Sequence, residues 1–209
     1  MKPTAAEKAY RQIKELIVTI RMPPGSVISE AKLMEDLQLG RTPIREAIKQ
    51  LQTENLVDVT PRRGMFVSEI TVTDLSQIFE VRVELESLAA RLATNRITPN
   101  QLSKLKLLAD RYHNISQSDK EKLINLDQDF HFLIAGASQN KFLRKELEYY
   151  YTLSLRIWYL AINSTQPQDI DVDSHIDIFE SIKSGDAQGA KQKMKNHIQR
   201  FHQTIRHYL

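Results

Sequence analysis

Four side chains in the second half of the chain have the types and spacing of a buried cation site. Asp127 and His131 are four residues apart and flank the apolar stripe of an expected helix over 120–137, so both can reach one point. His175 and His197 lie on the apolar faces of two further expected helices. Burying one carboxylate and three imidazoles is costly unless they are paired, and a divalent metal ion satisfies all four together.

The same histidines allow a simpler interpretation. A histidine on an apolar face is commonly a core residue bonded to a carbonyl or a serine, and Asp127 with His131 lacks the His-Glu-x-x-His signature of zinc hydrolases. A metal-dependent hydrolase would also need a general base, and Asp129 points about 200° around the helix from Asp127. A metal ion, a hydrolase site and a metal-free pocket therefore all stay open. We expect the remaining histidines at the surface or in hydrogen bonds: His113, His202 and His207.

A second group of side chains lies in the first part of the chain. The segment GRTPIREAIKQL begins an expected helix with basic and hydroxyl side chains, and PRRG forms a hairpin tip. At the start of a helix in the major groove, Arg bonds guanine and Thr or main-chain N–H groups hold phosphate. The alternative interpretation is that these basic side chains are ordinary solvated charges. The candidates for DNA contact are Arg41, Thr42, Arg45, Lys49, Arg63 and Gly64.

The elements expected around these candidates form a winged helix-turn-helix domain over residues 1–70. Apolar residues recur at helical spacing over 5–21, and a short helix closed by Gly40 follows. The next helix has Thr42 as its cap and Pro43 in its first turn. The period then changes to two in VDVT and MFVSEI, which predicts two strands joined at PRRG.

From residue 71 to 209 the spacing is helical and predicts an all-α antiparallel bundle. The fold class is therefore mainly α. The expected helices run over 73–95 with Thr73 as cap, from Thr98-Pro99, over 120–137, from Asn140 past Trp158, over about 173–184 and over about 186–208. Among these, the aromatic group at Tyr149–Tyr159 is typical of core or dimer packing.

Composition places the chain among folded proteins outside the membrane. The 209 residues have 41% hydrophobic and 26% charged side chains and a net charge of +3, so any nucleic-acid contact requires basic residues grouped on one surface. There is no cysteine, which fits a reducing cytoplasm. No apolar run approaches the roughly 18 residues that cross a bilayer.

The run PPGSVISEAKLMEDLQLGRTPIREAIKQLQTENLVDVTPRRGMFV resembles the winged helix of the GntR family of bacterial transcription regulators. The resemblance implies that Arg41, Thr42, Arg45, Arg63 and Gly64 contact operator DNA. Gly40-Arg41 stands where a Ser-Arg pair is commoner in the family, so a capping hydroxyl is missing and Thr42 is expected to supply it. The family also implies a homodimer on a pseudo-palindromic operator, with repression as the commoner outcome.

The stretches NLDQDFHFLIAGASQN and HIDIFESIKSGDAQGAKQKMKNHI resemble the effector-binding FCD domain of the FadR-type GntR subfamily. In its metal-containing branch, an Asp and three His fall at Asp127, His131, His175 and His197. The resemblance thus implies a divalent ion, zinc first and nickel or manganese as alternatives. Family effectors are often organic acids, and an ion with positions left open is expected to anchor a small carboxylate. Arg82 and Arg156 are candidates for holding a second carboxylate, with a surface or intradomain ion pair as the alternative for each.

Overall fold

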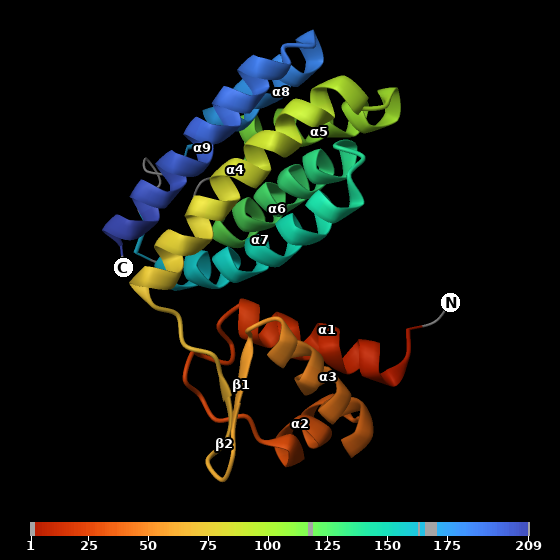
Figure 1. Cartoon of the computed structure of the whole chain (residues 1–209), viewed down its shortest axis with the longest axis vertical. Coiled ribbons are helices and arrows are strands. Elements are labelled where there is room, and N and C mark those ends of the chain that lie inside the picture. Colours follow the sequence, from red (N-terminus) through yellow and green to blue (C-terminus); the bar gives the residue numbers. More distant parts are fainter. Residues whose placement is uncertain (1–2, 117–118, 163, 166–170, 209) are drawn as a thin grey trace. The chain divides into compact units, whose positions relative to one another are not determined.

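The structure is a computed structural model that describes residues 3–116, 119–162, 164–165 and 171–208. Helices dominate, and the strands form one small sheet. The elements are α1 (Ala5–Val18), α2 (Glu30–Leu37), α3 (Arg41–Thr53), β1 (Val57–Thr60), β2 (Gly64–Val67), α4 (Val72–Arg96), α5 (Pro99–Asn114), α6 (Lys120–Ala137), α7 (Lys141–Ala161), α8 (Asp173–Ser184) and α9 (Ala187–His207). The mainly α class expected from the sequence is confirmed (Figure 1).

The chain divides into two compact units. The first comprises Met1–Thr71 with Leu155–Leu160, and the second comprises Val72–Ser154 with Ala161–Leu209. One short piece of α7 thus belongs to the unit that otherwise holds the N-terminal elements. Each unit has its own apolar core.

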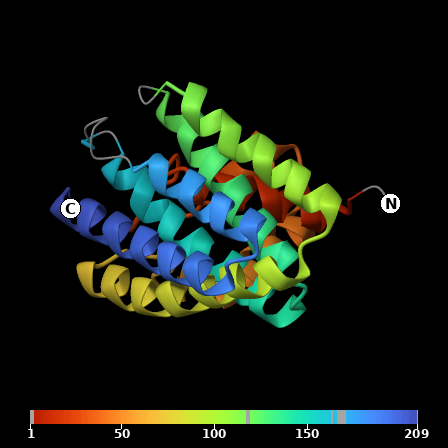
Figure 2. The same cartoon turned by 90° about the horizontal axis from the view of Figure 1, so that it is seen from above.

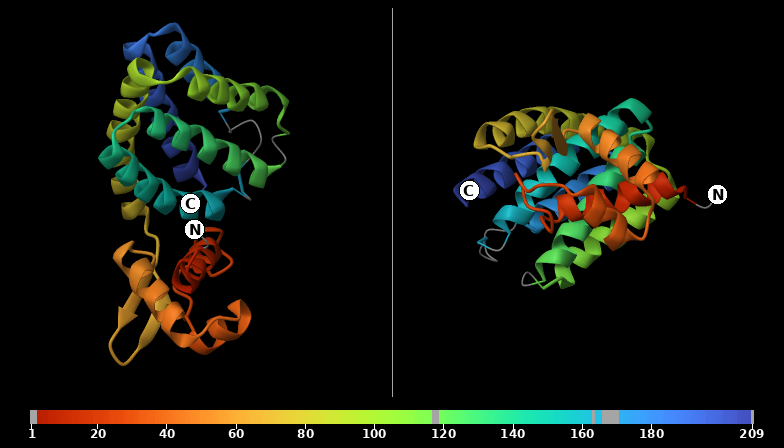
Figure 3. Two further views of the ribbon diagram at one scale, coloured as in Figure 1. Left: turned by 90° about the vertical axis from the view of Figure 1, so that its right-hand side faces the viewer. Right: turned by 90° about the horizontal axis from the view of Figure 1, so that it is seen from below.

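The first unit is a winged helix-turn-helix. Thr4 and Glu7 form a reciprocal capping box that starts α1, and the buried face of α1 packs against α3. β1 and β2 pair antiparallel, from Val57 opposite Val67 to Thr60 opposite Gly64, and form the wing beside α3 (Figure 3). Burial of one helical face drives the packing, and the core consists largely of Ala9, Ile13, Ile17, Ile44, Ile48, Leu51, Leu56, Val57 and Val67.

Two expected caps between α2 and α3 are wrong. The left-handed residue that ends α2 is Gln38, at φ 53°, and its side-chain amide donates to the Glu35 carbonyl at 2.7 Å. Gly40 is extended and is the N-cap of α3, without a side-chain cap bond. Thr42 lies inside the first turn of that helix. The turn is made at Gln38, two residues earlier than expected, which leaves Gly40 to start α3 without a capping hydroxyl.

The second unit is a bundle built around α4 and α9. α4 packs most extensively against α9 and also against α6, while α9 contacts α8 on its other side. Figure 2 shows α9 lying between α4 and α8. Expected starts hold at α5, where Thr98 and Gln101 form a capping box, and at α7, where the Asn140 side chain accepts from the Phe142 and Leu143 N–H groups. α4 begins at Val72, so Thr73 lies within its first turn and is not its cap.

Candidate functional site

The start of α3 presents two arginines to solvent. The Arg41 and Arg45 side chains are 72% and 68% exposed, and each Nε lies near the Glu30 carboxylate of α2, at 3.4 and 3.5 Å. Ion pairs this exposed contribute little to stability. The structure therefore brings the two arginines together on one surface, where they stay accessible to a partner.

The other candidates for DNA contact are also exposed: Thr42 and Lys49 on α3, and Arg63 and Gly64 in the wing. The wing turn is closed by the Arg63 N–H, which donates to the Thr60 carbonyl at 3.1 Å. Gly64 has φ 111° and nothing within 4 Å of a Cβ placed there. Backbone conformation rather than crowding thus favours glycine at this position.

The candidate cation ligands converge inside the second unit. Asp127 and His131 come from α6, His175 from α8 and His197 from α9. Each offers one ligand atom, and these four atoms all lie within 4.8 Å of one another. His175 Nε2 is 2.9 Å from Asp127 Oδ1, and the Nε2 atoms of His131 and His197 are 3.2 Å apart. Three helices therefore deliver one carboxylate and three ring nitrogens to one buried place.

Other side chains hold the ligand residues from behind. Their contacts are Tyr151 Oη to Asp127 Oδ2 at 2.6 Å, Ser174 Oγ to His197 Nδ1 at 2.7 Å, and Glu86 Oε2 to His131 Nδ1. A histidine engaged at Nδ1 presents Nε2 to the interior of the cluster. The His175 Nδ1 atom has no hydrogen-bond partner among the described residues, but its ring stacks on Tyr112 with 4.1 Å between centroids.

This donor set fits a divalent cation. Where two Nε2 atoms face each other, one must carry a proton to make a hydrogen bond, whereas a cation accepts both lone pairs. Three imidazole nitrogens and one carboxylate oxygen are ligands that zinc and nickel take, and manganese also accepts carboxylate. The His131–His197 contact is thus the part of the cluster that protein hydrogen bonding explains least well.

Burial and nearby charges oppose each other in shifting the pKa of Asp127 and of His131, but act together on the pKa of His197. Burial raises the pKa of Asp127, but His131 and His175 lower it more, and the pKa lies well below its usual range. Burial lowers the pKa of His131, yet Glu86 and Asp127 outweigh it and raise the pKa to about 9. For His197, burial and the neighbouring histidines both lower the pKa. The carboxylate is therefore ionised, and the His197 ring is neutral.

The two arginines considered for effector binding already have partners. Arg82 is 3% exposed; its Nε donates to Glu86 at 2.8 Å and its Nη1 to Ser154 Oγ at 2.8 Å. Arg156 belongs to the first unit, where its Nη2 donates to the Ser68 carbonyl. Arg82 thus lies directly behind the Asp/His cluster, through Glu86, whereas Arg156 is not part of it.

Three side chains hold the ligand residues from behind and form what is called here the outer layer: Glu86, Tyr151 and Ser174. None of them was predicted from the sequence as part of the site. Glu86 follows Arg82 by one helical turn, a spacing that signals an ion pair. Tyr151 lies in the aromatic group expected to form core or dimer packing, and no pattern marks its hydroxyl. Ser174 directly precedes His175 but contacts His197, 23 residues away in sequence. Only the first of these had a usable signal.

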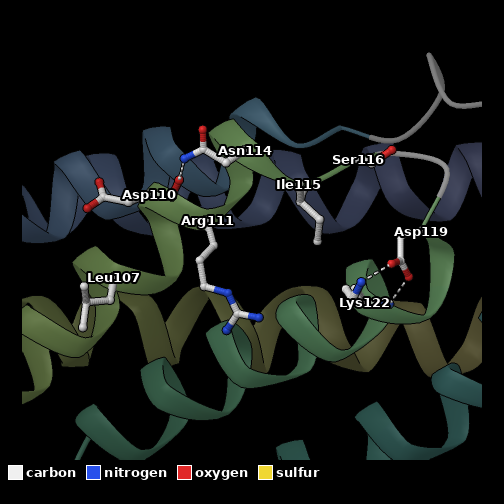
Figure 4. A pocket seen from close by; sticks show the side chains of 8 residues that line it. All are labelled: Leu107, Asp110, Arg111, Asn114, Ile115, Ser116, Asp119 and Lys122. Atoms are coloured by element: carbon white, nitrogen blue, oxygen red, sulfur yellow. Dashed lines mark hydrogen bonds and ion pairs between the residues drawn. The ribbon is translucent and has the colours of Figure 1, made fainter.

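The second unit also has surface pockets. One of about 450 Å³ lies where α5 ends and α6 begins, and in Figure 4 Arg111 extends between Leu107 and the Asp119–Lys122 ion pair. Another, of about 440 Å³, lies between α8 and α9 and includes Ser174. Neither is lined by a candidate cation ligand.

The sequence matches two family models. Residues 5–67 match the bacterial regulatory proteins of the gntR family, and residues 77–200 match the FCD domain. The chain belongs to the GntR family. It is therefore a transcription regulator with an N-terminal DNA-binding domain and a C-terminal FCD domain, as the resemblance implied, and it is not an enzyme. The metal-dependent hydrolase considered above is wrong.

Individual relatives cover almost the whole chain. The HTH-type transcriptional repressor RspR of Escherichia coli (strain K12) is 24% identical over 201 residues, which are 96% of this chain and 88% of that protein. The uncharacterized HTH-type transcriptional regulator YdhC of Bacillus subtilis (strain 168) is 27% identical, over 96% and 90%. The solved structure of E. coli McbR/YncC superposes with a TM-score of 0.84 at 22% identity, over 97% of both chains, and so shares the fold. Among the described helices, none is long and apolar enough to cross a bilayer.

Proposed function

We propose that this GntR-family regulator is a cytoplasmic repressor that binds a pseudo-palindromic operator as a homodimer and releases it when a small organic acid binds the second unit. A two-fold dimer presents two reading heads to half-sites about one helical turn, or a multiple of it, apart. The similarity to RspR, a repressor by name, supports repression. The proposed DNA contacts are Arg41, Thr42, Arg45, Lys49, Arg63 and Gly64.

In the sensing unit, we assign a divalent cation to Asp127, His131, His175 and His197, with zinc first and nickel or manganese as alternatives. The observation that carries this assignment is the approach of their four ligand atoms to within 4.8 Å of one another. A cation with a coordination number above four has further positions for the oxygens of a small carboxylate. The residues of the chain hold the ion and exclude water around it.

The buried charges support an acidic effector. Asp127 and Glu86 are negative, Arg82 is positive, and all three are buried. Without a cation, the pKa of about 9 keeps His131 protonated, and a bound cation displaces that proton. With the histidines then neutral, Asp127, Glu86 and Arg82 carry one net negative charge, and the divalent cation changes this to one net positive charge. A single carboxylate then neutralises the site, as burial requires. Arg82 and Arg156, the candidates for holding a second carboxylate, both already donate to acceptors, so the cation is the anchor for the effector.

Metal analysis combined with a ligand screen tests this proposal. Purified protein is expected to hold near one divalent metal ion per chain, and organic acids are expected to raise Tm and release operator DNA only without chelator. His197→Ala should abolish both responses. His207→Ala, which removes an exposed histidine of the same helix, should leave them intact. Protein that rejects added zinc but still responds to an acid would establish a metal-free regulator instead.

A further inference from the structure

Glu86 connects the Asp/His cluster to a second buried network. Its Oε1 accepts from Arg82 Nε at 2.8 Å, while its Oε2 meets His131 Nδ1. Arg82 in turn donates from Nη1 to Ser154 Oγ at 2.8 Å. The contacts therefore run from α7 through α4 to α6 and end on a candidate cation ligand. Glu86 and Arg82 are only 4% and 3% exposed.

Stability is not needed to explain why the Arg82–Glu86 ion pair is buried here. A buried ion pair of this kind often contributes no more than well-packed apolar side chains of the same volume. Arg82 and Glu86 are one helical turn apart on α4, so their mutual contact joins no two helices. Two contacts of the pair cross between helices, Arg82 to Ser154 on α7 and Glu86 to His131 on α6. Only the second ends on a candidate cation ligand, which points to a role at the cluster.

The contact with Glu86 determines how His131 is presented. A cation can bind Nε2 only after that atom has lost its proton, and the carboxylate at Nδ1 then favours the tautomer that keeps the remaining proton on Nδ1. The lone pair of Nε2 is then directed to the other side of the ring. There, Nε2 lies 3.6 Å from Asp127 Oδ1 and 3.2 Å from His197 Nε2. Glu86 therefore favours the one form of His131 that can bind a cation within the cluster.

We propose that Glu86 is a positioning residue for the cation site: it fixes the tautomer and ring orientation of His131, while Arg82 and Ser154 hold the Glu86 carboxylate in place. This inference rests on the proposed function, since it requires the cation. It assigns Arg82 to the support of Glu86 rather than to the effector. Tyr151 on Asp127 and Ser174 on His197 complete the same layer at two further ligands.

Zinc titration of chelator-treated full-length protein tests the role of Glu86. Glu86→Gln keeps the shape of the side chain but removes its charge, and should weaken zinc binding by about 10–100-fold, the usual effect of losing such a partner. The matched control is Glu84→Gln, which changes an exposed carboxylate of the same helix that pairs with Lys195 at 3.2 Å. This control should bind zinc as the wild type does.

A second variant separates positioning from stability. The double substitution Arg82→Met with Glu86→Leu replaces the ion pair by apolar side chains, which a buried site tolerates. It should fold and yet show the same loss of zinc affinity as Glu86→Gln. A spectroscopic readout is the nitrogen NMR of labelled histidines: zinc-loaded wild type should show His131 protonated at Nδ1 and bound at Nε2, and both variants should lose the hydrogen-bonded Nδ1 proton signal.

The outcomes distinguish the two proposals. If the wild type binds no zinc, nickel or manganese, the proposed cation site fails, and the positioning role fails with it. If the wild type binds zinc, and Glu86→Gln binds it equally tightly with an unchanged His131 spectrum, the role of Glu86 is overturned while the cation site stands. Weaker zinc binding in Glu86→Gln and in the double variant, with Glu84→Gln unchanged, supports the inference.

Discussion

The start of α3 and the Asp/His cluster both gather polar side chains, but they hold them in opposite ways. Arg41 and Arg45 are more than two-thirds exposed and only loosely paired with Glu30. The histidines and Asp127 are buried, and most of their outer atoms meet a dedicated partner. An exposed charge remains available for a large partner such as DNA, at little consequence for folding. A buried one must be satisfied before any ligand arrives, so function and stability are coupled there.

The largest expected effect is a difference in the free energy of unfolding between a variant of the buried region and a variant of the exposed region. Arg82→Met leaves the Glu86 carboxylate buried without its main positive partner, and should lower the free energy of unfolding by about 3–5 kcal/mol. Arg45→Met removes an equally long cation from the surface, and should change it by no more than about 0.5 kcal/mol. Urea denaturation of both variants measures the difference. Equal losses of unfolding free energy would show that burial does not make the two regions differ in their contribution to stability.

Zinc should stabilise the folded protein only when the buried Asp/His cluster is intact. A ligand present at 100 times its Kd adds about 2.7 kcal/mol to the folded state, and each kcal/mol moves Tm by about 2–4 °C in a chain of this size. Chelator-treated wild type and Arg45→Ala should both show this rise, whereas His175→Ala should not. Thermal unfolding with and without zinc gives the measurement. A rise retained in His175→Ala would remove that histidine from the site.

Much of the fold and part of the cluster could be predicted from the sequence. Local signals were sufficient for the helices, for the capping box at Thr98 and for the four-residue spacing of Asp127 and His131. The outer layer could not be predicted, because its contacts join residues distant in sequence. Tyr151 meets Asp127 across 24 residues and Glu86 meets His131 across 45. Such pairs depend on how helices pack, which hydrophobic periodicity does not specify.

In the exposed region, the main expected effect of a substitution is weaker DNA binding. Arg45→Ala should weaken specific binding by about 1–3 kcal/mol per reading head and relax sequence preference, because a forked contact to guanine is lost. Fluorescence anisotropy on a duplex selected by the wild type from random sequences measures this loss. Arg21→Ala, an exposed arginine of the same unit paired with Glu15 at 2.6 Å, is the matched control. Undiminished affinity in Arg45→Ala would exclude the start of α3 as the reading surface.

The smallest expected effect concerns Lys49, which is exposed one turn further along α3. A lysine at this distance from the helix start is suited to phosphate, whose contact carries no sequence information. Lys49→Ala should therefore weaken specific and non-specific duplexes alike and reduce the slope of log K against log salt by about 1 per head. Titrations between about 50 and 200 mM salt give that slope, with Gln50→Ala, a neighbouring exposed change, as control. A loss confined to the specific duplex would instead make Lys49 a base-reading residue and extend the reading surface along α3.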